Sequence, residues 1–164
     1  MSGNHNPTLR FMFQRGTDQI KELCDGLSNA DSLRQMPLDH NCINYTVGHV
    51  IHYRQHILKT LGVEAFDWPE ALAESYSGNI GTTEDALAGA GQGLTLDQLL
   101  AKLDESQALL DSALGSRDVG NFPETREFFG NPEATAADVI GFMSWHESQH
   151  LGQLDVLVQV LRLA

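Results

Sequence analysis

The chain has 164 residues, of which 41% are hydrophobic and 20% charged, so it can bury a core and has the composition of a soluble globular protein. Its net charge of −12, without a local cluster of lysine and arginine, argues against nucleic-acid and membrane partners. It lacks both a hydrophobic run of the ~18 residues that cross a membrane and a signal peptide, so we expect one cytoplasmic domain over residues 1–164 with Cys24 and Cys42 reduced and buried.

Two helices are expected in the first part of the chain. Hydrophobic residues recur at three- and four-residue steps from Leu9 to Leu27, which predicts the first helix. A loop follows over about residues 29–41. The second helix is predicted from about Cys42 to Leu61, with Gly62 as its C-terminal stop.

The middle of the chain contains a glycine-rich segment. Residues 63–93 are predicted to be irregular, apart from a short helix that residues 68–76 could form. Thr95 followed by Gln98 is a capping box, in which each side chain accepts a hydrogen bond from the backbone of the other. It predicts the start of a third helix, whose leucines continue to Leu114.

The last helix is predicted to be the longest. After a loop at about residues 116–132, Thr135 and Asp138 open a helix that runs to about Leu163. No segment shows the convincing alternation of a strand. Four amphipathic helices in a chain of this size predict an all-α fold, a four-helix bundle with long connecting loops that could fold over one end.

Two histidines of the last helix are predicted to share one face. His146 and His150 are one turn apart, ~40° from each other around the helix, and near the middle of its hydrophobic stripe. A metal ion would satisfy both buried imidazoles at once. Hydrogen bonding of each histidine to a core neighbour is the alternative. The stripe consists of Val139, Phe142, Met143, Leu154, Leu157, Val160 and Leu161, with Ser144 among the residues on the opposite side.

The second helix offers His49, His52 and His56, on the side opposite its aliphatic stripe. This pattern leaves two interpretations open: the histidine face is solvated, or the helix is covered on both sides. Arg54 lies within the stripe, which favours an interface edge over a dry core. Because one small bundle does not easily bury both faces, we expect a homodimer.

Gly48-His49 in the second helix and the run Trp145 to Gln153 (WHESQHLGQ) resemble the DinB-like superfamily of bacterial four-helix bundles. The resemblance covers nearly the whole chain. It implies that His49, His146 and His150 hold one metal ion, and it matches Gly152-Gln153 to a Gly-Gln pair after the second histidine. Leu151 departs from the pattern, in which arginine is common. The remaining histidines match nothing in it and are left out of the site: His5, His40, His52 and His56.

Three neutral imidazoles would leave a divalent ion with open positions, the arrangement of catalytic rather than structural sites. Imidazole suits zinc or nickel, with iron or cobalt as alternatives. By analogy with relatives, the resemblance implies a thiol-dependent transferase or isomerase, or a hydrolase, that acts on a small electrophile with a low-molecular-weight thiol as a partner. A non-catalytic metal- or ligand-binding stress-response module is the alternative, and a bundle without metal is a third.

Four neighbours of the proposed ligands are assigned roles from their positions on the predicted helices. Glu147 is interpreted as surface or interface charge, and Trp145 as packed against another helix. Gln153 could donate a hydrogen bond to one of the metal ligands, or it could pack at the edge of the core. Tyr45, one turn before His49, could donate a hydrogen bond to a substrate.

Overall fold

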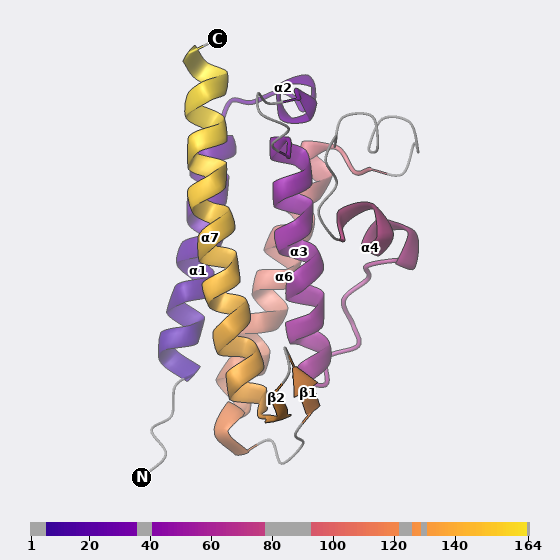
Figure 1. Cartoon of the computed structure of the whole chain (residues 1–164), viewed down its shortest axis with the longest axis vertical. Helices are drawn as coiled ribbons and strands as arrows, with labels where there is room; N and C mark the ends of the chain where they lie inside the picture. The colour runs from indigo at the N-terminus through magenta and orange to yellow at the C-terminus, as the bar shows by residue number, and fades with distance from the viewer. Residues whose placement is uncertain (1–5, 36–40, 78–92, 122–125, 129–130, 164) are drawn as a thin grey trace.

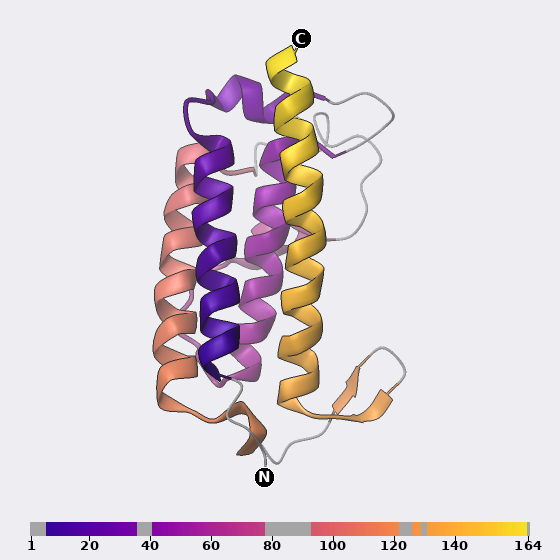
Figure 2. The same cartoon turned by 90° about the vertical axis from the view of Figure 1, so that its left-hand side faces the viewer.

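The computed structural model of the chain describes residues 6–35, 41–77, 93–121, 126–128 and 131–163. Four long helices form a bundle in which α1 and α3 each pack against both α6 and α7 (Figures 1 and 2). The predicted all-α fold is therefore confirmed. The long helices are α1 (Asn6–Cys24), α3 (Ile43–Thr60), α6 (Leu96–Ser116) and α7 (Ala136–Leu163).

The boundaries of the long helices follow from local capping. At the start of α6, the Thr95 hydroxyl accepts from the Gln98 backbone, and the Gln98 side chain accepts from the Thr95 backbone. Thr135 and Asp138 make the same pair of bonds at the start of α7. Gly62 follows α3 with a φ of +69°, a left-handed conformation that glycine adopts without steric cost. These predicted boundaries are confirmed.

Three short helical elements lie in the described parts of the segments that connect the long helices. The predicted short helix is confirmed as α4 (Glu70–Tyr76). The loop predicted over residues 29–41 is wrong at its start, because Ser28 and Asp31 form a capping box that opens α2 (Asn29–Leu33). A 3-10 turn, η2 (Val119–Asn121), follows α6.

A β-hairpin corrects the second predicted loop. The strands β1 (Arg126–Phe128) and β2 (Asn131–Ala134) pair antiparallel where residues 116–132 were expected to be irregular. Strands of three and four residues are too short to show an alternating pattern in the sequence. The hairpin lies at the end of the bundle where α7 begins (Figure 1). The glycine-rich residues 78–92 lie outside the described residues.

Both cysteines are buried free thiols, as predicted. Burial raises the pKa of the Cys24 thiol to about 11, so it stays protonated at neutral pH. Cys42 is the N-cap of α3, and its sulfur accepts a hydrogen bond from the Tyr45 backbone. The two cysteines therefore act as small core groups rather than as nucleophiles.

α3 is the most enclosed of the helices that carry histidines. Fifteen of its 18 residues are buried, His49 and His52 among them, so a fully solvated histidine face is wrong, although His56 is exposed. The helix is covered on both sides, since α6 and α7 pack against it and α4 and α2 contact it as well (Figure 1). One chain thus buries both faces, which removes the stated reason for a homodimer. The dimer itself stays a prediction.

A buried polar cluster joins all four long helices. Arg54 is fully buried, and its guanidinium donates to both carboxylate oxygens of Glu147 at 2.6 and 2.9 Å. It also donates to the Thr17 hydroxyl at 2.9 Å and the Phe13 carbonyl at 3.1 Å. The expectations of an interface edge for Arg54 and of surface charge for Glu147 are therefore wrong. We call this the Arg54 cluster; its members are Phe13, Thr17, Arg54, Ser106, Gln107 and Glu147.

Gly16 of α1 makes room for this cluster. A methyl group at Gly16 would overlap the Glu147 carboxylate. The Glu147 side of α7 is thus turned into the bundle, and Ser144, predicted on the opposite side, is buried too. Val160, placed in the hydrophobic stripe, is instead exposed. The buried face of α7 is therefore rotated from the predicted one, which leaves His146 and His150 at its edge, towards α3.

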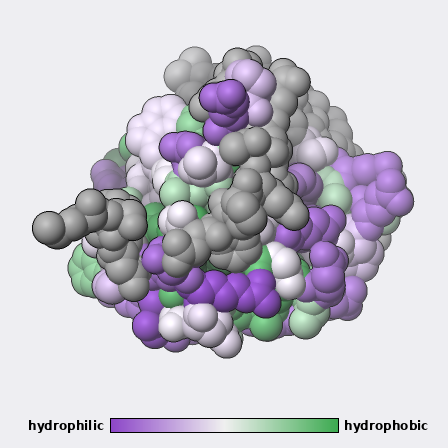
Figure 3. Space-filling view, turned by 90° about the horizontal axis from the view of Figure 1, so that it is seen from below, coloured by the Kyte–Doolittle hydropathy of each residue, from purple (hydrophilic) through white to green (hydrophobic). Residues whose placement is uncertain are grey.

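None of the helices in the described part of the chain combines the length and the hydropathy that a membrane crossing requires. Figure 3 shows the end of the bundle that carries the hairpin. Among the coloured residues on this face, the hydrophobic ones form small areas between hydrophilic ones.

Candidate metal centre

Three histidines from two helices converge in the groove between α3 and α7. His49 comes from α3, and His146 and His150 come from adjacent turns of α7. One ring nitrogen of each lies within 4.8 Å of the others. The Nε2 atoms of His146 and His150 are 3.1 Å apart, and the His49 ring centroid is 4.7 Å from that of His150. The structure thus brings together the three histidines that the sequence singled out.

The outer nitrogens of two of these rings are held by hydrogen-bond acceptors. His49 Nδ1 lies 2.7 Å from the Tyr76 carbonyl oxygen, and His150 Nδ1 lies 2.7 Å from Gln153 Oε1. An oxygen acceptor requires the proton on Nδ1, which leaves the lone pair on Nε2 free to face the centre of the group. This arrangement of outer acceptors is characteristic of metal-binding histidines. Gln153 thus contacts a proposed ligand, but as a hydrogen-bond acceptor rather than as the expected donor.

The ring of Tyr76 explains why a glycine, Gly48, precedes His49. A methyl group there would overlap the ring of Tyr76, which lies directly against the α3 backbone. Tyr76 is held in this position because its hydroxyl donates to Asn44 Oδ1 at 3.0 Å and accepts from the Leu94 backbone at 2.9 Å. Its carbonyl can therefore meet His49 Nδ1. The sequence held no sign of this role, since Tyr76 is 27 residues from His49.

The histidines are neutral at physiological pH. Burial lowers the pKa of His49 and of His146 to about 4 and also lowers that of His150. The other two histidines lower the pKa of His49 further, since like charges would gather in one place. Neutral imidazoles are the form that binds metals, so protons compete weakly for this site at pH 7.

The donor set fits a divalent transition metal. A tetrahedral zinc ion about 2.0–2.1 Å from each imidazole nitrogen would hold those nitrogens about 3.3 Å apart. The separation of 3.1 Å between His146 and His150 is close to this value, while the widest separation in the group would have to shorten. Three imidazoles favour zinc, nickel, cobalt or iron(II) over magnesium or calcium.

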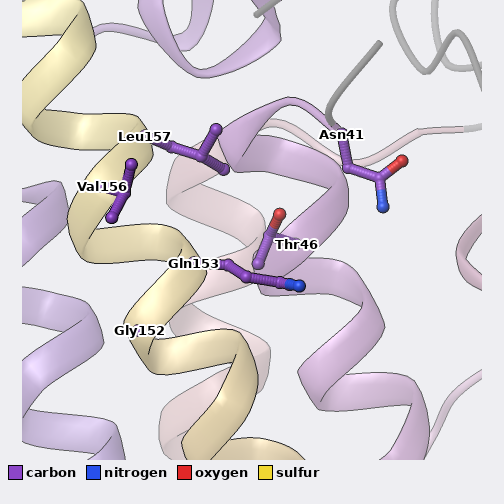
Figure 4. Close-up of a pocket in the computed structure, with 6 residues that line it drawn as sticks. All are labelled: Asn41, Thr46, Gly152, Gln153, Val156 and Leu157. Atoms are coloured by element: carbon purple, nitrogen blue, oxygen red, sulfur yellow. The ribbon is translucent and has the colours of Figure 1, made fainter. Parts of the chain in front are cut away.

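A pocket of about 300 Å³ lies one helical turn beyond the histidines, between α3 and α7. Gln153 belongs to both sites, because its side chain lines the pocket and also accepts the hydrogen bond from His150. Figure 4 shows this side chain reaching from α7 towards Thr46 of α3. Among the described residues, those that line the pocket carry no charge; they are Asn41, Thr46, Gly152, Gln153, Val156 and Leu157.

Two other residues considered in the sequence, Tyr45 and Trp145, do not have the places considered for them. Tyr45 is fully buried and stacks on His49, and burial raises the pKa of its hydroxyl to about 12. It is therefore packed in the core rather than open to a substrate. Trp145 is 52% exposed, so its predicted packing against another helix is wrong. His52 and His56 lie further along α3 and are not in the converging group. His5 and His40 are outside the described residues.

Tyr53 is a neighbour of the site that the sequence analysis missed. Its ring centroid lies 4.7 Å from that of His49 and 4.5 Å from that of His146. It follows His49 by one helical turn, so helical spacing could have found it.

A model of the DinB superfamily matches residues 12–154, a range that includes all three converging histidines. No curated protein matches the chain.

Proposed function

Because the chain belongs to the DinB superfamily, we propose that it is a metal-dependent enzyme that binds one divalent transition-metal ion through His49, His146 and His150. The observation that carries this proposal is the convergence of the three imidazoles with two of their outer nitrogens already held. Unpaired polar groups are costly to bury, and here three neutral rings present lone pairs to one point. A cation at that point is the simplest partner for all three.

The reaction class we propose is transfer or isomerisation with a low-molecular-weight thiol, or hydrolysis, on a small electrophile. Bound there, a divalent ion would lower the pKa of a coordinated thiol or water and so supply the nucleophile at neutral pH. The chain supplies the pocket beside it, where Asn41, Thr46 and Gln153 are the polar groups that could orient an uncharged substrate. Zinc or nickel is the proposed metal, with iron or cobalt as alternatives.

A non-catalytic metal binder is the second candidate, and the Arg54 cluster favours it. Glu147 is the acidic residue adjacent to His146, but Arg54 occupies both of its carboxylate oxygens inside the bundle. It is therefore not placed to act as a general base at the histidines. Turnover separates the two candidates.

The first test is metal analysis of tag-free protein, with His146→Ala as the comparison. We expect about one zinc or nickel ion per chain in the wild type and its loss in the variant, with circular dichroism showing that both remain helical. If neither protein holds metal after reloading with zinc, nickel, cobalt and iron(II), the proposal is wrong.

The second test is a substrate screen on the loaded protein. Cysteine or glutathione with 1-chloro-2,4-dinitrobenzene probes thiol transfer, and a p-nitrophenyl ester probes hydrolysis. We expect metal-dependent turnover in the wild type that is absent from His146→Ala. A protein that holds its ion tightly and turns over neither class is instead the non-catalytic binder.

A further inference from the structure

A second pair of histidines on α3 has the same internal geometry as the α7 pair. His52 and His56 are one helical turn apart, and their Nε2 atoms are 3.3 Å apart, against 3.1 Å for His146 and His150. The ring planes are nearly perpendicular in both pairs, at 87° and 80°. Two imidazole nitrogens at this separation match the distance of about 3.3 Å between neighbouring ligands of a tetrahedral zinc ion.

We propose that His52 and His56 bind a second divalent transition-metal ion, at a site separate from the three-histidine group. The two sites are distinct because neither of these histidines belongs to the converging group of described residues. The ring of Tyr53 contacts both sets, with centroids 4.5 Å from His146 and 5.3 Å from His52. A phenol ring is therefore the neighbour common to the two positions.

The burial of the pair fits an ion that comes from solvent. His52 is only 7% exposed, whereas His56 is exposed. The pair thus offers one ligand at the edge of the core and one at the surface, and water can complete the coordination. Imidazole ligands select zinc, nickel, copper or cobalt over magnesium or calcium.

Hydrogen bonding does not otherwise account for His52. Its Nδ1 is buried and has no hydrogen-bond partner among the described residues. The polar contact that its ring makes with them is the one between its Nε2 and Nε2 of His56. An ion at Nε2 would leave this Nδ1 without an acceptor, which distinguishes His52 from His49 and His150, whose outer nitrogens meet acceptors. The facing Nε2 atoms of His52 and His56 are the feature that a metal ion would use.

The second site is expected to be weaker than the first. It has two protein ligands rather than three. Burial is the main cause that lowers the pKa of both rings, and the nearby positive charge of Lys59 lowers it further. The same charge opposes a cation. The net charge of −12 on the whole chain acts in the other direction. We therefore expect the second ion to bind at least tenfold more weakly than the first.

The test counts zinc ions bound to the metal-free full chain as free zinc rises, by equilibrium dialysis with elemental analysis. Wild type should bind one ion tightly and a second more weakly. His56→Ala should lose only the weak step, and His146→Ala only the tight one. His56 is exposed, so its replacement should leave the fold intact, as circular dichroism can check. Lys59→Ala, at an exposed neighbour that is not a ligand, should keep both steps and move the weak one to lower free zinc, because the opposing charge is gone.

Nitrogen-detected spectra of protein with 15N-labelled histidine identify the ligand atoms. Across the weak step, the Nε2 signals of His52 and His56 should shift while those of His49 stay unchanged. A wild type that stops at one ion overturns the second site, as does a weak step that survives in His56→Ala, since another histidine would then bind that ion. Absence of the tight step alone would instead count against the proposed function and leave the second site standing.

Discussion

The Arg54 cluster and the three-histidine group are two polar regions that share helices α3 and α7, but their polar groups are satisfied in different ways. In the Arg54 cluster, the guanidinium finds the Glu147 carboxylate, a hydroxyl and a carbonyl within hydrogen-bonding distance. In the histidine group, acceptors hold the outer nitrogens of His49 and His150, while the inner nitrogens face one another. In the first region the two charged groups are paired within the chain, although Gln107 Nε2 has no hydrogen-bond partner among the described residues. The second region is where we propose that a cation binds.

This difference separates what holds the bundle together from what it can bind. Arg54 and Glu147 join α3 to α7 inside the core, while His49 and the α7 pair lie in the groove between the same two helices. The paired charges of Arg54 and Glu147 stabilise and orient the helices, whereas ring nitrogens that face one another are available for function. Four predictions test the contrast.

The largest expected effect comes from breaking the Arg54 cluster. Arg54→Ala would leave the Glu147 carboxylate buried without its partner, and such a loss typically costs about 3–5 kcal/mol of stability. Urea denaturation of metal-free protein measures the free energy of unfolding. Arg15→Ala removes an exposed arginine from α1 and should change it little. Equal stability of the two variants would contradict a structural role for the cluster.

The next effect is stabilisation of the histidine group by metal. If a cation completes this group as Glu147 completes the other, zinc at 100 times its dissociation constant should stabilise the fold by about 2.7 kcal/mol. Thermal or urea unfolding with and without zinc measures the gain. His150→Ala removes one of the α7 pair and should lose most of it. An equal gain in that variant would mean that zinc stabilises the protein elsewhere.

Gly48→Ala tests how far the histidine group depends on the packing of Tyr76 against α3. The added methyl group would overlap the Tyr76 ring, and overpacking of this kind costs about 1–3 kcal/mol. Because Tyr76 also holds His49, the variant should bind metal more weakly. The matched control is Gly141→Ala in α7, where a methyl group meets no atom within 4 Å. That change should gain up to about 1 kcal/mol from helix propensity, and a similar result at Gly48 would refute the packing argument.

The smallest effect is expected at Gln153. Its Oε1 accepts from His150 Nδ1, and loss of such an outer contact typically weakens metal binding about tenfold or more. Zinc affinity of Gln153→Ala, measured by competition with a chelator, checks this. Gln149→Ala, an exposed glutamine on the same helix, serves as the control and should bind zinc as the wild type does. If both variants kept wild-type affinity, His150 would need no partner at Nδ1.

Much of the fold could be predicted because its signals are local. Capping boxes mark the starts of α6 and α7. Gly62, the predicted C-terminal stop of α3, has a positive φ and lies two residues after the end of that helix. Of the short elements, the sequence predicted α4 but not α2 or the hairpin. The capping box of Ser28 and Asp31 was present in the sequence but overlooked, and the hairpin strands were too short for any pattern to show.

For the candidate site, helical spacing pointed to His146 and His150, because helical geometry follows from sequence separation. The choice of His49 over His52 and His56 came instead from the Gly-His dipeptide of the DinB-like resemblance. The role of His49, His146 and His150 as ligands awaits metal analysis. Tertiary structure alone decided that α3 is buried on both sides, that Tyr76 holds His49, and that His52 and His56 stay outside the group. It also decided that Arg54 and Glu147 meet in the core across 93 residues of sequence. Periodicity reports which residues share a face of one helix, whereas the partner of that face depends on how four helices pack together, and no single helix contains that information.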